Sequence, residues 1–193
     1  MPSSTTRNSI IEKADTLFYE SGFEATSFAD IAAAVGISRG NFYHHFKTKD
    51  EILYAVITHR MERTRHMLET WQEASQGPRD RIVSFISIAI ANQTKIMAFG
   101  CPVGTLCSEL AKLDHIAKGR AAQILTLFQD WLAGQFRMLG AGDRAEELAL
   151  HVLAWSQGVA VIATALADEG FIRREVAGVT AWLDALPGLS HHL

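Results

Sequence analysis

The chain has 193 residues, of which 48% are hydrophobic and 20% charged, so it can form a packed core and is not a disordered chain. Two cysteines are too few for a disulfide scaffold and four prolines too few for a turn-rich sheet protein, which indicates a helical protein of a reducing compartment. The formal net charge of −3 excludes a broad, sequence-blind binder of nucleic acid.

Two helices are predicted at the start of the chain. Apolar residues at helical spacing indicate a helix over residues 8–21, and Gly22 supplies the stop. Ser27 followed by Asp30 is a capping-box pattern, in which each side chain satisfies a backbone N–H of the other residue. A second helix is therefore expected to run to Val35.

A short helix and a long one follow. Gly36 breaks the second helix, and residues 38–46 form a short third helix that begins with a serine cap. Thr48 and Glu51 repeat the capping-box pattern. They open a fourth helix that is expected to run to about residue 75.

The rest of the chain is predicted to be helical as well. Gly77 and Pro78 mark a break, with the proline placed to start a helix, and a second break falls at residues 100–104. No strand alternation or internal repeat is present, so we expect an all-α fold with about nine helices. The remaining helices are predicted at about residues 79–97, 105–113, 115–139, 143–167 and 173–186.

Neither a secretory signal nor a membrane span is expected. The first ten residues are polar and lack the apolar core of a signal peptide. The longest apolar stretch, Leu148–Ala167, is interrupted by His151, Ser156 and Gln157, so we interpret it as a buried helix; a membrane span is the alternative. A cytoplasmic protein without a membrane partner is therefore expected.

The segment Phe28–Phe46 has the pattern of a helix-turn-helix. Two short helices that cross steeply need a small residue where they touch, here Ala32, and the tight turn needs a residue free to take positive φ, here Gly36. Residues 1–65 contain eight basic and eight acidic residues, but residues 38–49 contain three cations, two histidines and no acid. The positive field is therefore local to this motif. The apolar residues expected to fill the space between the two helices are Ile31, Val35, Ile37 and Phe42.

The stretch TSFADIAAAVGISRGNFYHHFKTKDEIL resembles the N-terminal DNA-binding domain of the TetR family. The likeness runs from about Arg7 to Thr58, and its most specific part is Gly40–Lys49. The family has there an apolar residue, Tyr, an aromatic residue or His, His or Tyr, Phe and then Lys-x-Lys, and this sequence follows that pattern. The resemblance implies a DNA-binding transcriptional regulator.

The motif assigns roles to residues of the third helix and its surroundings. Arg39 can pair with guanine and Asn41 with adenine, so these two are expected to read bases directly. The adjacent histidines could instead suggest a metal site, but neighbouring helical positions diverge by about 100°, so they would not chelate one ion. Hydroxyl and ammonium groups nearby suit phosphate oxygens, and a glycine allows close approach. The expected DNA-binding residues are Ser27, Ser38, Arg39, Gly40, Asn41, Tyr43, His44, His45, Lys47 and Lys49.

The resemblance also implies a division of the chain. Residues 1–50 are expected to form the helix-turn-helix domain and residues 51–193 a larger helical domain for ligand binding and dimerisation. A homodimer through the last two helices is expected because two recognition helices double the contacts of one. Each apolar stripe on these helices could instead face its own core. The stripes comprise Ala154, Gly158, Val161, Ile162 and Ala165 on one helix and Val176, Val179, Leu183 and Leu186 on the other.

The segment Gly100–Leu110 resembles a block in a TetR subgroup typified by LmrA and YxaF. If Pro102 opens a helix, Cys101 lies at its N-cap, where the partial positive charge favours the thiolate. Cys101 is then a possible electrophile or redox sensor; the alternative is a small buried apolar residue. Cys107 lies about 240° around the helix, so no disulfide with Cys101 is expected.

Ligand-binding residues are expected in the larger domain, although most aromatic residues there could be core. Polar His151 and Gln157 in an apolar helix could orient a ligand, because a buried polar group needs a partner. The expected ligand-binding residues are Trp71, Phe85, Met97, Phe99, Cys101, Phe128, Trp131, His151, Trp155 and Gln157.

An enzyme is the main rival function, and no Gly-x-Ser-x-Gly or comparable catalytic element is present. A helical interaction module without DNA binding is a second rival, which the intact recognition segment disfavours. We therefore expect a repressor released from a palindromic double-stranded DNA operator by a small molecule, without cofactor or metal. The alternative is a repressor that senses electrophiles or oxidants through Cys101.

Overall fold

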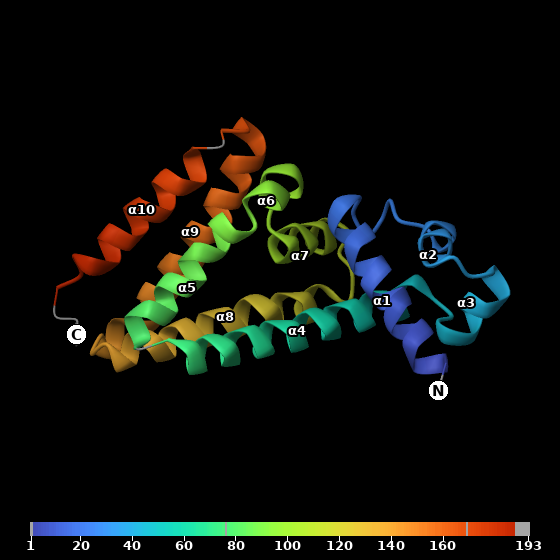
Figure 1. Ribbon diagram of the computed structural model, residues 1–193, viewed down its shortest axis with the longest axis horizontal. Coiled ribbons are helices and arrows are strands. Elements are labelled where there is room, and N and C mark those ends of the chain that lie inside the picture. The colour runs from blue at the N-terminus through green and yellow to red at the C-terminus, as the bar shows by residue number, and fades with distance from the viewer. Residues whose placement is uncertain (1, 76, 169, 188–193) are drawn as a thin grey trace. The chain divides into compact units, whose positions relative to one another are not determined.

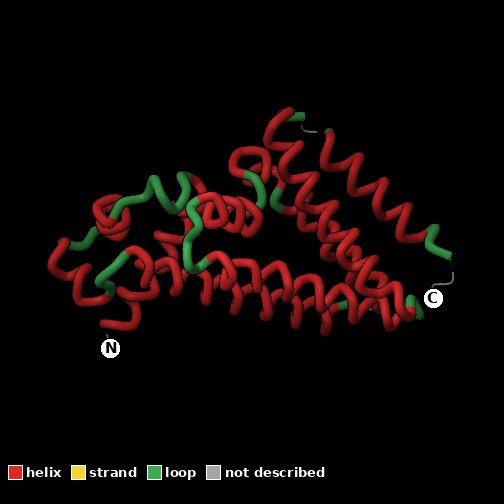
Figure 2. Tube along the Cα trace, turned by 180° about the vertical axis from the view of Figure 1, so that it is seen from behind, coloured by secondary structure: helices red, strands yellow, loops and turns green. Residues whose placement is uncertain are grey.

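The computed structural model describes residues 2–75, 77–168 and 170–187, and this part of the chain is helical, with no strand (Figures 1 and 2). The expectation of an all-α fold is confirmed. The first half contains α1 (Pro2–Glu20), α2 (Phe28–Val35), α3 (Arg39–His45), α4 (Lys49–Ala74) and α5 (Pro78–Ala91). The second half contains α6 (Gln93–Phe99), α7 (Pro102–Lys112), α8 (Lys118–Met138), the 3₁₀-helix η1 (Gly142–Arg144), α9 (Ala145–Leu166) and α10 (Phe171–Asp184).

The described residues form one more α-helix than the nine expected, because the helix predicted over residues 79–97 is divided. The division falls at Asn92, whose φ of −110° and ψ of 17° are not helical. Its amide side chain donates to the Ile88 carbonyl oxygen at 3.1 Å, a local bond that competes with the helical ladder. The helix is thus broken at an asparagine, whereas the sequence prediction placed helix breaks at glycine and proline residues.

The chain folds into two compact units. The first comprises the residues up to 64 together with 105–122, and the second comprises residues 65–104 and those from 123 onward. Three helices, α4, α7 and α8, each contribute residues to both units. A boundary at residue 50 would fall just inside α4, so the functional division at that position stays a prediction.

The first unit holds the helix-turn-helix. Its core contains the fully buried Ile10, Ile31, Phe42 and Leu53, from α1, α2, α3 and α4. Arg60 of α4 and Asp15 of α1 also form a buried ion pair there, with Nε and Oδ1 2.5 Å apart. The Arg60 side chain is only 8% exposed and that of Asp15 17%, so water screens this pair weakly.

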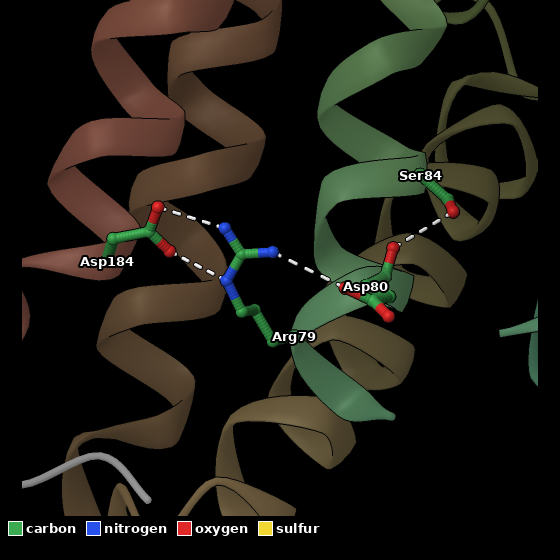
Figure 3. A network of polar contacts seen from close by, with 4 residues as sticks. All are labelled: Arg79, Asp80, Ser84 and Asp184. Atoms are coloured by element: carbon green, nitrogen blue, oxygen red, sulfur yellow. Dashed lines mark hydrogen bonds and ion pairs between the residues drawn. The ribbon is translucent and has the colours of Figure 1, made fainter. Parts of the chain in front are cut away.

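The second unit is built around α5, α9 and α10, which pack against one another. Arg79 in the first turn of α5 binds Asp184 at the end of α10 through two parallel hydrogen bonds of 2.7 and 2.9 Å (Figure 3). Its remaining terminal nitrogen lies 3.4 Å from Asp80. The carbonyl oxygen of Asp80 accepts from the Ser84 hydroxyl at 3.0 Å. All three charged side chains are at least 36% exposed, so the network fixes geometry more than it adds stability.

The apolar stretch predicted as a buried helix forms α9. The span Gly142–Leu166 is long and apolar enough to cross a membrane by composition alone, a test that core helices of soluble proteins also pass. Eight residues of α9 are buried within the protein. Its Thr164 hydroxyl donates to the Ile96 carbonyl oxygen at 2.8 Å, a tertiary bond to α6.

Candidate nucleic-acid interface

The first helix of the motif, α2, is closed at its N-terminus by the predicted capping box. The Ser27 hydroxyl accepts from the Asp30 backbone N–H, and the Ser27 N–H donates to the Asp30 carboxylate at 2.8 Å. The Ser27 hydroxyl also donates to that carboxylate at 2.6 Å. These two bonds to the carboxylate lower the pKa of Asp30 below its ordinary 3.8, and the bond from the Ser27 hydroxyl has the larger effect. The Ser27 hydroxyl is therefore already engaged, and its expected phosphate contact stays a prediction.

The turn and the second helix have the geometry that the sequence predicts. Gly36 takes the left-handed conformation, with φ 75°, and its N–H satisfies the carbonyl oxygens of Ala32 and Ala33. Ser38 caps α3 by accepting from the Asn41 N–H at 3.3 Å. Phe42 is 1% exposed, so it anchors α3 in the core of the first unit. The remaining face of α3 is thereby turned outward.

That outward face carries most of the residues expected to read DNA. Asn41, Tyr43 and His44 are exposed, and His45 is half-buried. Gly40 is exposed as well, and a Cβ built there would meet nothing within 4 Å, so the space beside it is open. The side chain of Arg39 lies outside the described side chains, and its base contact stays a prediction.

Tyr43 is supported from α2. Its ring stacks on that of Phe28, with centroids 5.6 Å apart and planes 26° apart. A cavity of about 230 Å³ lies beside this stack, between α2 and α3. It is lined by Ser27, Phe28, Ala29, Ala32, Phe42 and Tyr43. The stack holds a 47%-exposed tyrosine in place, which suits a side chain that meets a DNA backbone.

The two lysines expected to bind phosphate both have partners within the protein. The Lys47 ammonium donates to the Tyr43 carbonyl oxygen. That of Lys49 donates to the carbonyl oxygens of Phe23 and Glu24, at 3.0 and 3.1 Å. An ammonium has three donors, so Lys49 keeps at most one for a phosphate. Its expected role as a phosphate ligand stays a prediction, and the structure adds a second role.

The start of α4 departs from the predicted capping box. The Thr48 hydroxyl accepts from the Glu51 N–H at 3.1 Å, as the pattern implies. The Glu51 carboxylate, however, accepts from the backbone N–H of Lys47 at 2.7 Å, one residue earlier than the box places it. The cap thereby also orders the link between α3 and α4.

Sequence reasoning missed Glu109 of α7 in the first unit. Its carboxylate accepts from the backbone N–H groups of Phe23 and Glu24, each at 2.9 Å. The contact joins residues that are more than eighty positions apart, so no local pattern could reveal it. The sequence marks this region only by the unusual block Gly100–Leu110, in which Cys101 and not Glu109 stands out as a candidate functional residue.

The expected ligand-binding residues are arranged partly in pairs within the second unit. The rings of Phe85 and Phe128 lie 5.3 Å apart, both largely buried, and those of Trp71 and Trp131 lie 5.8 Å apart. Trp155 has a buried indole N–H with no acceptor in the described part of the chain. Met97 and Phe99 are half-buried.

One premise of the ligand prediction is corrected. His151 is exposed and packs its ring on Trp182 at 4.6 Å, so the argument from a buried polar group does not apply to it. Gln157 is half-buried, and its amide donates to the Ser156 hydroxyl at 3.2 Å. A larger surface cavity of about 440 Å³ lies in the first unit, between α1 and α4. The expected ligand pocket in the second unit stays a prediction.

Cys101 has the predicted position directly before α7. Its Sγ accepts from the backbone N–H of Gly104 at 3.4 Å, as an N-cap side chain does. A Cβ on Gly104 would lie 2.1 Å from the Gln157 side-chain oxygen, so a larger residue there would displace the Gln157 amide. Cys101 and Cys107 are both half-buried, and no disulfide joins them in the described part of the chain.

The two stripes expected to form a dimer face have different environments. On α9, Val161 is 69% exposed and Ile162 42%, next to exposed Ala154, Gly158 and Ala165. The α10 stripe is a correction, because its residues pack into the core of their own unit. These buried residues are Val176, Val179, Leu183 and Leu186. The exposed face of α10 instead carries the small residues Ala177, Gly178 and Ala181.

Known proteins share both the motif and the fold. Residues 10–56 match the family model described as bacterial regulatory proteins, tetR family. The HTH-type transcriptional repressor DhaR of Mycobacterium sp. (strain GP1) is 26% identical over 127 residues, which are 65% of this chain and 61% of DhaR. The HTH-type transcriptional regulator YxaF of Bacillus subtilis (strain 168) is 28% identical over 143 residues, 73% of each chain.

The fold extends the likeness beyond the motif. The crystal structure of a TetR transcriptional regulator from Chloroflexus aurantiacus J-10-FL superposes with a TM-score of 0.82 over 98% of this chain and 99% of that one. At 19% identity this likeness concerns the fold. The family match covers the capped α2, the glycine turn and α3, and the relatives extend over both units. Residues 10–56 therefore carry the DNA-binding motif of the tetR family of bacterial regulatory proteins, and the chain has the fold of a TetR regulator.

Proposed function

We propose that the chain is a cytoplasmic transcriptional repressor that binds a near-palindromic operator in double-stranded DNA. The observation that carries the proposal is the outward face of α3, where Asn41, Tyr43 and His44 are exposed on a helix anchored by buried Phe42. Amide and imidazole groups on the exposed face of such a helix suit base edges in the major groove. We propose repression and not activation of transcription because the relative DhaR is named as a repressor.

A gel-shift titration with the duplex upstream of the chain's own gene tests this function. Specific binding should survive an excess of unrelated duplex, and the logarithm of the affinity should fall linearly with the logarithm of the salt concentration. Binding that unrelated duplex competes away equally, or no binding at low salt, would contradict the proposal.

The proposed repressor acts as a homodimer through α9 and α10. Their exposed faces carry small and apolar side chains, among which Val161 is 69% and Leu166 67% exposed. Such a patch on a protein surface marks an interaction site, and a two-fold axis would pair the patch with itself. Two recognition helices would then meet half-sites about one DNA turn apart, or somewhat more in a wide dimer.

The second unit is the proposed sensor of a small molecule. The buried indole N–H of Trp155 lacks an acceptor in the described part of the chain, which favours a ligand that supplies an acceptor oxygen among aromatic side chains. The unbroken helix α4 gives residues to both units, so ligand and DNA should bind antagonistically and reciprocally. A tenfold loss of DNA affinity needs only about 1.4 kcal/mol of coupling.

Modification of Cys101 is the alternative signal. Its sulfur accepts from the backbone N–H of Gly104 in the first turn of α7, and its side chain is half-buried, so a reagent can reach it. Replacement Cys101→Ser should abolish release by an electrophile such as a maleimide and leave release by a reversible ligand intact. Full release of the serine variant by the electrophile would exclude this alternative.

A further inference from the structure

The loop between α1 and α2 is held by two opposite charges that do not belong to it. Glu109 of α7 accepts from the N–H groups of Phe23 and Glu24, each at 2.9 Å. Lys49, the first residue of α4, donates to the carbonyl oxygens of the same two residues at 3.0 and 3.1 Å. The peptide group that joins Phe23 to Glu24 is thus bound by a carboxylate on one side and an ammonium on the other.

Charge-assisted hydrogen bonds are shorter and stronger than neutral ones, and four of them converge on this loop. The surrounding side chains leave the loop little freedom. Phe23 is 2% exposed, and its ring lies 5.3 Å from that of His115, edge to face. The buried Thr26 closes the loop by donating its hydroxyl to the Gly22 carbonyl oxygen at 2.7 Å.

Gly22 is fitted to the same arrangement. Its φ of +92° strains any side chain, and a Cβ there would lie 3.1 Å from the nearer carboxylate oxygen of Glu109. Gly22, which the sequence predicts only as the end of a helix, therefore also leaves space for the Glu109 carboxylate. α2 begins directly after this loop, so the loop sets where the helix-turn-helix starts.

We propose that Glu109 is a positioning residue of the DNA-binding unit, which holds the α1–α2 loop, and with it α2 and α3, in the conformation that binds DNA. The inference rests on the proposed DNA-binding function. Both ribbon views place the end of α7 beside the end of α1 (Figures 1 and 2). The first residues of α7, up to Gly104, belong to the other unit, so the backbone of this helix connects the second unit to Glu109, whose carboxylate is hydrogen-bonded to the loop.

The variant Glu109→Gln tests the proposal, because the amide keeps the shape of the side chain but offers one acceptor oxygen and places a donor against a backbone N–H. Glu73→Gln, an exposed position on α4, is the control for the removal of one charge. Amide hydrogen exchange at Phe23 and Glu24 should quicken in Glu109→Gln alone. Affinity for an operator selected by the wild-type protein should fall about tenfold, as the competent fraction falls.

A second readout separates positioning from simple destabilisation. The operator is compared with a copy that carries one extra base pair between its half-sites. Loss of folded protein lowers the affinities for the two duplexes by the same factor. A loosened loop should instead reduce the ratio of the affinity for the operator to the affinity for the copy with the extra base pair. Unchanged exchange at the two amides, or an unchanged affinity and ratio, would overturn the proposal. Failure of the wild-type protein to select any duplex would refute the proposed function, and the exchange measurement would still test the hold of Glu109 on the loop.

Discussion

Asn41 illustrates how a small motif specifies a surface. Its backbone N–H is bound by the Ser38 cap, which starts α3, and buried Phe42 fixes the rotation of the helix. Because the rotation of the helix is fixed, Asn41 lies on its exposed face. Local rules predicted this arrangement because the cap, the turn and the anchor lie within a few residues of one another.

The replacement Asn41→Ala should therefore act on base recognition. We expect an affinity loss of roughly 1–3 kcal/mol for the cognate operator, with relaxed preference at one base pair of each half-site. Lys47→Ala should instead weaken all sequences similarly and reduce the salt slope by about one unit for each phosphate that is no longer neutralised. Fluorescence anisotropy with single-base operator variants distinguishes these outcomes. A relaxed base preference in Lys47→Ala with none in Asn41→Ala would reverse the assignment.

Asp30 provides a test that needs no DNA. The pKa of its carboxyl is lowered by the Ser27 hydroxyl and N–H, so its contribution to the stability of α2 is complete at neutral pH. That contribution should disappear only as the pH falls through the lowered folded-state pKa, below the ordinary 3.8. Ser27→Ala should move the NMR titration midpoint of Asp30 upward. A wild-type midpoint at or above 3.8 would contradict the capping box as the cause.

At the scale of elements, local signals predicted most helix boundaries and long-range contacts decided the rest. The glycine turn at Gly36 and the proline start at Pro78 were predictable because backbone geometry selects those residues. The division at Asn92 was not, since a lone asparagine breaks a helix only in some contexts. Glu109 and the buried face of α10 depend on tertiary partners far away in sequence, which a single sequence does not display.

The ion pair between α1 and α4 should be essential to the first unit. Arg60→Ala leaves the Asp15 carboxylate largely buried without its partner, so we expect a loss of about 3 kcal/mol in the free energy of unfolding. Urea denaturation measures this loss. The double replacement Asp15→Leu with Arg60→Met should cost less than Arg60→Ala, because no buried charge remains. A loss below about 1 kcal/mol in Arg60→Ala would show that water reaches the pair.

For the whole molecule, the exposed face of α9 is the feature that its own fold does not explain. Val161 is 69% exposed, so Val161→Asp should leave the protomer folded and disrupt a dimer that buries this position. Sedimentation should show a monomer, and operator affinity should fall steeply. Met138→Asp, at a 53%-exposed position on α8, is the matched control and should stay dimeric. An undisturbed dimer in Val161→Asp would place the interface elsewhere.

The second unit can act as a sensor only if a ligand bound there changes the conformation of the DNA-binding residues. α4 and α7 both give residues to the two units, α4 ending at Trp71–Ala74 and α7 carrying Glu109. A change in the second unit would reach the first along these helices only if they shift as elements with two discrete arrangements. Ligand and operator would then compete through the protein's conformation.

The proposed function requires the chain to bind DNA as a symmetric dimer. Selection of bound duplexes from a random-sequence pool by the 193-residue protein, followed by sequencing, is the decisive test. We predict an enriched inverted repeat whose half-sites are centred about 10 base pairs apart, or somewhat more. A single unrepeated half-site would contradict the dimer, and a pool without enrichment would contradict sequence-specific binding itself.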